Sequence, residues 1–148
     1  MFGGRVDHQL DEKNRMRIPK MYLEGFPNGE ELYFVEYAPG CISIMPQSVR
    51  DRRLAPLEDF NPGDEEMMDA ARRIFSSIMP VEKDNQGRTK IPKMFREIAG
   101  LKKDIVTVGF MDYIEVWDKD RYEFKHSALS LSEANKRYYS RKKSGEDA

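Results

Sequence analysis

The sequence predicts an α+β domain with internal pseudo-symmetry, built from two copies of one small strand-and-turn unit with helices added after each copy. Three observations predict this fold class. Residues 11–21 (DEKNRMRIPKM) return as 84–94 (DNQGRTKIPKM), with six identical positions in register at an offset of 73 residues. Short segments rich in β-branched and aromatic residues follow each copy. Between the copies, apolar residues recur at the three- and four-residue spacing of a helix.

Each copy is expected to begin as a strand, a tight turn and a second strand. In the first copy, arginines alternate with apolar residues over 15–18 (RMRI), the period-two pattern of a half-buried strand. The polar residues 11–14 are then the tip of a hairpin that follows the stretch 5–10. Asn14 suits the left-handed conformation that this turn requires, and Gly87 reaches it without steric cost in the second copy.

The remaining elements follow in the same order in both copies. Short helices after the shared proline are expected at 20–25 and 93–100, each ended by a glycine. Paired strands are expected at 31–37 with 41–45 and at 105–110 with 113–117. The added helices are expected at 47–57, 64–78, 119–125 and 132–139.

The segment 64–78 carries the strongest helical pattern among the added helices. Asp64 is suited to cap its start, and Glu65 and Glu66 in the first turn favour the helix dipole. Its apolar residues lie on one helix face, which we expect to be mostly core: Met67, Met68, Ala71, Ile74, Phe75 and Ile78. Met67, Met68 and Met79 are also candidates for a contact between subunits.

Length and composition indicate one domain that both repeats share. The expected parts are the first repeat at 1–63, the connecting helix and second repeat at 64–140, and a disordered polar tail at 141–148. Each half alone would bury little apolar surface. The longest apolar stretches fall far short of the roughly 20 residues that a membrane span needs. A single cysteine, Cys41, and an N-terminal stretch without an apolar run of signal-peptide length lead us to expect a cytoplasmic protein.

The repeated turns are the strongest candidates for a functional site. Each places an arginine directly after the turn, Arg15 and Arg88, with a second cation two residues further, Arg17 and Lys90. A two-stranded ribbon fits the major groove of DNA, where arginine pairs with guanine and lysine meets phosphate. The alternative is structural, since Asp11 and Asp84 are spaced to pair with these arginines and fix the turns. Because the net charge of the chain is −1, any binding of nucleic acid must use a local patch.

At this point the sequence resembles a known family, the MraZ proteins of bacteria, over residues 1 to about 139. The resemblance is carried by the start Met1-Phe2, the motifs DEKNR and DNQGR with the following Ile-Pro-Lys, the Ala71-Arg72-Arg73 segment, and YIEVWD at 113–118. Asn14 replaces the glycine of the first motif, and Gly3 stands where the family often has arginine. The resemblance implies an AbrB-like swapped-hairpin β-barrel made from two interleaved copies of one unit, here within one chain.

The resemblance also implies the function and its partners. The expected protein is a transcriptional regulator of the division and cell-wall gene cluster, nucleoid-associated and without a cofactor. It would bind double-stranded DNA at tandem direct repeats upstream of its own operon, as a ring-shaped homo-oligomer. The expected DNA contacts are Lys13, Arg15, Arg17, Lys20, Arg88 and Lys90. The expected turn-structuring residues are Asp11, Asn14, Asp84 and Gly87.

Two other classes of function were weighed. An enzyme finds little support, because the sequence has two histidines, one cysteine in a predicted strand, no phosphate loop and no paired metal-ligand motif. The main competitor is a protein-interaction or assembly module that has lost specific DNA binding. The basic residues 136–143 are more typical of a solvated tail than of a DNA contact, so they are left outside the expected site.

Overall fold

The structure of this protein is a computed structural model that describes residues 1–126 and 128–147 of the chain. Its strands are β1 (Arg5–Gln9), β2 (Arg15–Arg17), β3 (Leu32–Val35), β4 (Ile42–Pro46), β5 (Ile78–Pro80), β6 (Arg88–Lys90), β7 (Asp104–Phe110) and β8 (Tyr113–Asp118). Its helices are α1 (Lys20–Leu23), α2 (Gln47–Leu54), the 3-10 turn η1 (Ala55–Glu58), α3 (Glu65–Phe75), α4 (Lys93–Ala99), α5 (Lys119–His126) and α6 (Leu131–Asp147). The α+β class predicted from the sequence is confirmed.

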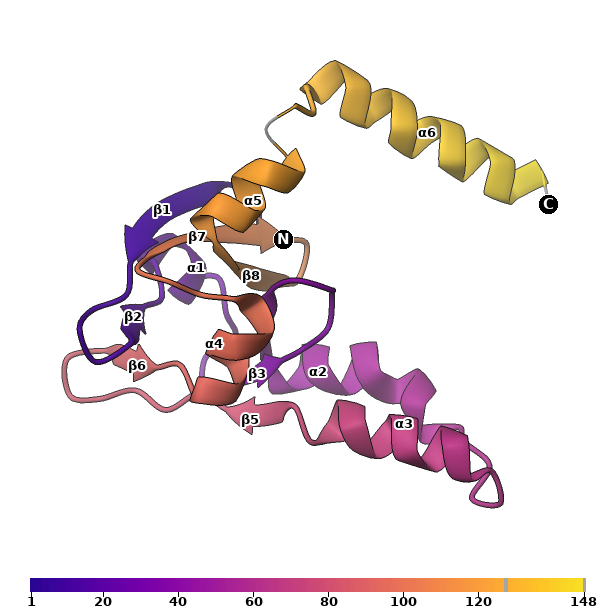
Figure 1. Ribbon diagram of the computed structural model, residues 1–148, viewed down its shortest axis with the longest axis horizontal. Coiled ribbons are helices and arrows are strands. Elements are labelled where there is room, and N and C mark those ends of the chain that lie inside the picture. Colours follow the sequence, from indigo (N-terminus) through magenta and orange to yellow (C-terminus); the bar gives the residue numbers. More distant parts are fainter. Residues whose placement is uncertain (127, 148) are drawn as a thin grey trace.

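The strands form two antiparallel sheets (Figure 1). One has six strands in the order β1-β7-β8-β4-β3-β5, and the other pairs β2 with β6. Over the described residues these sheets do not close into a barrel.

The pairing of the strands is exchanged between the two repeats. The sequence predicts that each turn joins two strands of one hairpin, and this prediction is wrong, because β1 pairs with β7 and β2 pairs with β6. The second repeat is paired in the same way: β5 is its equivalent of β1, and it pairs with β3, the equivalent of β7 in the first repeat. Asp7 lies opposite Val106, and the residues at the 73-residue offset, Pro80 and Tyr33, lie opposite each other. A tight turn leaves the chain free to place its two arms in different sheets, so the turn sequence alone does not reveal the exchange.

The strand order of the large sheet reads the same from both ends once the repeats are exchanged. Its centre is the β4–β8 pair, where Ser43 lies opposite Glu115. The centre of the small sheet is the pair of Met16 with Thr89, which are equivalent positions of the two repeats. All four residues are buried, so the pseudo-two-fold relationship runs through the interior.

Equivalent residues of the two repeats fill one core. Met16 and Ile18 are buried, which confirms the alternation predicted over 15–18. Tyr22 of α1 and Phe95 of α4 occupy matching positions and are both almost completely buried. The ring of Phe95 packs 5.4 Å from the ring of Phe34, centroid to centroid, which joins the second repeat to the first. The core therefore depends on side chains of both repeats.

Three predicted helices differ from the structure. The predicted helix 47–57 is α2 followed by the 3-10 turn η1. The predicted helix 64–78 ends at Phe75, because residues 78–80 are drawn into the sheet as β5 beside β3. The predicted core face of α3 is wrong, since no residue of this helix is buried and Met67 and Phe75 are each 43% exposed. The C-terminal helix α6 continues to Asp147, so residues 141–147 of the predicted tail are helical, and residue 148 lies outside the described residues.

Two helical segments extend from the body of the molecule (Figure 1). Helices α2 and α3 run side by side as one arm, and a groove lies between them. Helix α6 follows α5 and stands clear of the sheets.

Candidate nucleic-acid interface

The two repeated turns lie beside each other at one end of the molecule (Figure 1). The antiparallel pairing of β2 with β6 places Arg15 opposite Lys90 and Arg17 opposite Arg88. The side chains at the centre of the pair point inward and are buried, as described above for the small sheet. The flanking cations therefore lie on the outer side of this small ribbon.

The first turn is organised by one carboxylate. Asp11 accepts hydrogen bonds at Oδ1 from the backbone N–H groups of Lys13 and Arg15, each at 2.9 Å. The backbone N–H of Asn14 donates to the carbonyl of Asp11 at 2.9 Å, and Asn14 has a φ of 60°. The structure thus confirms the positive φ predicted at Asn14. These bonds satisfy the backbone N–H groups of the turn without a partner strand.

The second turn repeats the same bonds. Asp84 accepts at Oδ1 from the N–H groups of Gln86 and Arg88, each at 2.9 Å. Gly87 has a φ of 75°, as predicted, and its N–H donates to the carbonyl of Asp84 at 3.1 Å. The backbone N–H groups of Arg15 and Arg88, followed by other hydrogen bonds within each turn, hold the pKa of Asp11 and Asp84 below the usual value of 3.8. Both aspartates are therefore carboxylates at neutral pH.

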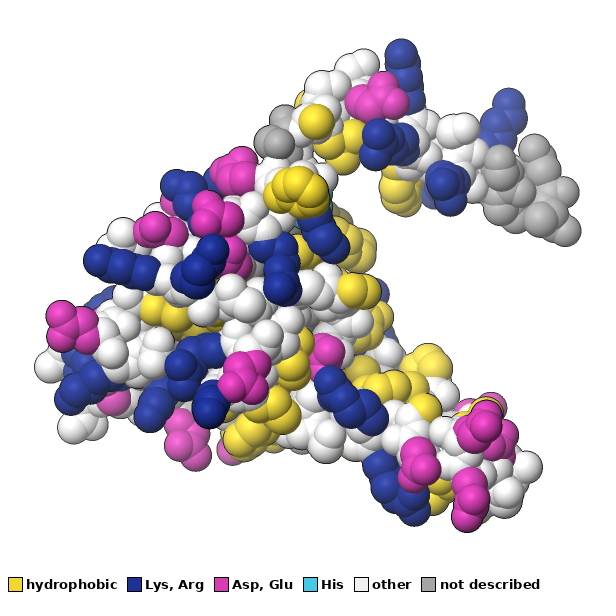
Figure 2. Space-filling view, viewed as in Figure 1, with side chains coloured by type: hydrophobic (Ala, Val, Ile, Leu, Met, Phe, Trp, Pro, Cys, Tyr) yellow, Lys and Arg dark blue, Asp and Glu magenta, His cyan; other side chains and the backbone are white. Residues whose placement is uncertain are grey.

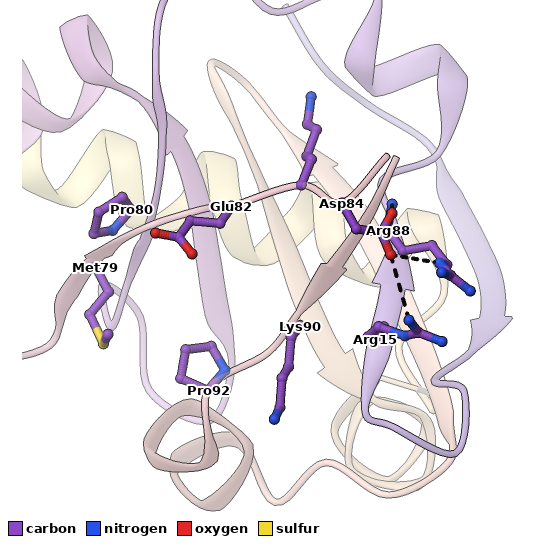
Figure 3. Close-up of a pocket in the computed structure, with 9 residues that line it drawn as sticks. Arg15, Met79, Pro80, Glu82, Asp84, Arg88, Lys90 and Pro92 are labelled. Carbon is purple, nitrogen blue, oxygen red and sulfur yellow. Dashed lines mark hydrogen bonds and ion pairs between the residues drawn. The ribbon is translucent and has the colours of Figure 1, made fainter. Parts of the chain in front are cut away.

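The arginines that follow the turns are bonded to these carboxylates, and Figure 3 shows both arginines beside Asp84. Arg15 donates through Nε to Asp11 at 2.7 Å, and Arg88 donates through Nε to Asp84 at 2.8 Å. Arg15 also places Nη1 3.6 Å from Asp84 Oδ2, across the repeats. The structural alternative weighed for these residues is present in both turns. Arg15 and Arg88 are thus half-buried, while part of each guanidinium stays accessible.

The other expected cations are more exposed. Lys13, Arg17, Lys20 and Lys90 are all exposed. Arg17 donates to the carbonyl of Gln86, which adds a second contact between the turns. Lys20 belongs to α1 rather than to the ribbon, and its Nζ atom lies 3.7 Å from Oε1 of Glu24.

A cation that the sequence analysis missed lies next to the second turn. Lys83 is exposed and lines a shallow depression together with Arg15, Arg88 and Lys90 (Figure 3). Its equivalent in the first repeat is Leu10, which is buried, so comparison of the repeats gives no signal for it. The depression also contains acidic and apolar side chains, namely Met79, Pro80, Glu82, Asp84 and Pro92.

The charge of the paired turns has the opposite sign from that of the chain. Residues 11–17 and 83–90 carry six Lys or Arg against three Asp or Glu, whereas the whole chain has a net charge of −1. Figure 2 shows basic side chains gathered at this end of the molecule. A local positive surface on a nearly neutral protein attracts a polyanion only at that surface.

Across 1–126 and 128–147, no group of three or more His, Cys, Asp or Glu side chains is arranged to hold a metal ion. Cys41 is fully buried, and burial raises the pKa of its thiol. None of the described helices has both the length and the apolar character needed to cross a bilayer.

These features define a two-repeat α+β protein with exchanged strands and a paired set of basic turns. Comparison with known proteins gives its family. Residues 74–142 match the family model described as "MraZ protein, putative antitoxin-like". The chain belongs to the MraZ family, because curated members exceed 30% identity over most of its length.

Three relatives show the extent of this similarity, and each bears the name "Transcriptional regulator MraZ". The protein from Lachnoclostridium phytofermentans is 33% identical over 123 residues, which are 83% of this chain and 85% of the relative. The protein from Clostridium beijerinckii is 32% identical over 135 residues, or 88% and 92% of the two chains. The protein from Pelotomaculum thermopropionicum is 34% identical over 137 residues, or 90% and 91%.

Proposed function

We propose that this protein is a transcriptional regulator that binds double-stranded DNA in a sequence-specific manner through its paired basic turns. In this proposal it acts in the cytoplasm, associated with the nucleoid. It recognises tandem direct repeats upstream of its own operon, within the division and cell-wall gene cluster. Several copies form a ring in which each presents its turns to a successive repeat. The exchanged strands and the name of the relatives support this function. The exchanged strands also support the swapped-hairpin architecture that the family resemblance implies.

The observation that carries the proposal is the pairing of the two turns into one exposed basic ribbon. A two-stranded ribbon has the width that the major groove admits. Lys13, Arg17 and Lys90 extend from it and meet phosphates, which fix the orientation of the protein on the duplex. Lys83 extends the same surface beside the second turn.

Arg15 and Arg88 have a double role in the proposal. Their Nε atoms hold the turn carboxylates, which fixes the direction of each guanidinium before DNA arrives. The contacts of the described residues engage Nε and Nη1 of Arg15, which leaves Nη2 for a base edge or a phosphate. Lys20, which lies on α1 beside Glu24, contributes only general attraction to the duplex.

Several copies acting together fit the modest local charge. The surplus of cations at one pair of turns gives weak binding at physiological salt, because each neutralised phosphate contributes only a small increment. Linking several such sites along tandem repeats raises the apparent affinity steeply.

The proposal is tested by fluorescence anisotropy with a duplex that carries the tandem repeats of the upstream region and with a scrambled duplex, over a salt series. Tight binding to the repeats alone is expected. Each phosphate contact removed by Lys13→Ala or Lys90→Ala should lower the slope of log K against log salt by about 0.9 per bound chain. Lys136→Ala, at an exposed lysine of α6, the helix that stands clear of the sheets, is the matched control and should leave the slope unchanged. Equal, weak binding to both duplexes contradicts the proposal.

The second candidate function is an assembly module that has lost specific DNA binding. The exposed apolar faces of α3 and α6 favour it, because they offer surface for contacts between proteins. The two functions separate at Arg15. Arg15→Ala abolishes preference for the repeats and leaves the oligomer mass unchanged if the protein is a regulator. If the protein serves only in assembly, the variant changes no promoter-specific property.

A further inference from the structure

Helix α6 is basic on the surface and carries an unpartnered apolar stripe. Over 131–143 it has five Lys or Arg and one Glu. Leu131 and Tyr138 are 78% and 62% exposed, and Ala134 lies between them at helical spacing on the same face. Within its own chain, α6 stands clear of the sheets (Figure 1). A solvent-exposed helix gains nothing from such a stripe, so the stripe calls for a partner surface.

The arm formed by α2 and α3 is acidic toward its tip, and its five arginines are each paired with a carboxylate of the same chain: Arg50, Arg52, Arg53, Arg72 and Arg73. No basic residue occurs over 54–71, which holds six Asp or Glu. Met67 and Phe75 lie exposed on one side of α3. Figure 2 shows acidic side chains gathered at the tip of this arm and basic ones along α6.

A groove between α2 and α3 continues the apolar side of α3. Tyr33, Leu54, Phe75 and Ile78 contribute its apolar lining. Its charged lining is Glu58 and the pair Arg50–Asp51, whose Nη2 and Oδ1 atoms lie 2.7 Å apart. An aromatic side chain is the usual anchor for a groove of this kind, and a neighbouring carboxylate suits a basic partner helix.

We propose that α6 of one copy docks on the α2–α3 arm of the next copy, with Tyr138 in the groove and the basic side chains of α6 against the acidic ones of the arm. This inference rests on the proposed function for the ring, and it names the two surfaces that join neighbouring subunits. Because the surfaces differ, the contact is head to tail, which generates a closed ring or an open chain rather than a two-fold dimer. Among the described residues no ion pair joins α6 to α3 within one chain, in line with a partner from a second copy.

The face of each helix that takes part is defined by helical spacing, which supplies matched variants. Arg141 and Lys142 lie on the same face of α6 as Tyr138, whereas Lys136 and Lys143 lie on the opposite face. Substitution of Arg141 and Lys142 by glutamate removes two cations from the contact. Substitution of Lys136 and Lys143 by glutamate changes the net charge by the same amount and leaves the contact intact.

The test is the mass of the full-length protein in solution, measured by light scattering without DNA. Arg141→Glu with Lys142→Glu is expected to lower the mass, and Lys136→Glu with Lys143→Glu to retain it. Asp51→Lys with Glu58→Lys, at the two carboxylates that line the groove, is expected to lower the mass as well. A mixture of the two low-mass variants should recover the wild-type mass, because each variant then meets a surface of opposite charge.

The inference is overturned if the face variants keep the wild-type mass, or if the mixture stays at low mass. A loss of DNA affinity by the Arg141 and Lys142 variant at unchanged mass would assign α6 to DNA and also overturn it. Circular dichroism on each variant verifies that the fold is retained. Since the mass is measured without DNA, failure of this inference is distinct from failure of the proposed function, which is judged only in the duplex titration.

Discussion

Arg15 in the first turn places its Nη1 atom 3.6 Å from Oδ2 of Asp84 in the second turn, so one guanidinium joins the two repeats. The reverse contact is absent from the described residues, where Arg88 pairs with Asp84 alone. Asp84 therefore serves the arginines of both turns, while Asp11 serves only one. Two turns with the same sequence motif have acquired unequal roles in the paired ribbon.

This asymmetry gives a prediction for the dynamics of the turns. Asp11→Asn should speed amide hydrogen exchange only in the first turn, because its bonds to Lys13 and Arg15 are local. Asp84→Asn should speed exchange in both turns, because Arg15 loses its contact across the repeats as well. Hydrogen exchange followed by mass spectrometry measures this difference. An effect of Asp84→Asn confined to its own turn would contradict it.

A second prediction concerns pH and His8. Burial lowers the pKa of His8 below its usual value of 6.5, and its ring nitrogen Nε2 lies 2.7 Å from Oγ1 of Thr107. The unfolded chain therefore binds the proton more readily than the folded chain. The stability that His8 contributes is present above about pH 6.5 and is lost as the pH falls through the folded-state pKa. The melting temperature should decrease from pH 7 toward pH 5.5, and His8→Gln should flatten this decrease. An unaltered slope in the variant would rule out His8 as its source.

A third prediction concerns the hydroxyl of Tyr22. This hydroxyl donates to the carbonyl of Gly4 at 2.9 Å, and the side chain is 1% exposed. Phe95 fills the equivalent position in the second repeat, so Tyr22→Phe keeps a ring that the core accepts. Loss of the hydrogen bond should lower the free energy of unfolding by about 1 kcal/mol in urea titration. Tyr37→Phe, at a ring that is 39% exposed, is the control and should change it by less than about 0.5 kcal/mol.

A fourth prediction concerns Gly109 of β7, whose backbone packs against Gly3 of the N-terminal segment. A Cβ atom on Gly109 would lie 2.5 Å from the backbone N and O atoms of Gly3, so Gly109→Ala must displace the chain near residue 3. We expect a loss of about 1–3 kcal/mol in the free energy of unfolding. Gly3→Ala adds a methyl group where nothing lies within 4 Å, and it should be neutral. Without the steric clash, alanine in a strand would instead raise the free energy of unfolding. A stabilised Gly109→Ala variant would therefore contradict the prediction.

The local parts of the fold follow from the sequence. The positive φ angles of Asn14 and Gly87 were predicted from the repeat, because a turn of this kind admits few residues there. The alternation that buries Met16 and exposes Arg17 was predicted for the same reason, since the period of a strand is a property of the backbone. Local rules therefore predicted the turns and the strand that follows each turn.

The long-range parts did not follow from the sequence. Nothing in residues 5–9 distinguishes a partner in the next strand from one in the other repeat, so the residue pattern predicts a simple hairpin, and only the family resemblance implies interleaved repeats. The apolar spacing of α3 was recognised, but spacing does not say whether the core has room for the helix, and Phe75 stays exposed. The pairing of Arg15 with Asp11 is local and was weighed from the sequence, whereas its contact with Asp84 depends on the distance between the turns. These features depend on tertiary packing, which one sequence does not encode in a short window.

The exchanged pairing of β1 also bears on how the chain folds during its synthesis. Gln9 bonds to Asp104, 95 residues further along the chain. At about 5–20 residues per second, the ribosome needs roughly 5–20 s to deliver this partner. Strand β5, by contrast, pairs with β3, which has already been made when β5 emerges. Strand β1, the first to leave the ribosome, must therefore wait for its partner, whereas its equivalent β5 pairs with a strand that has already been made.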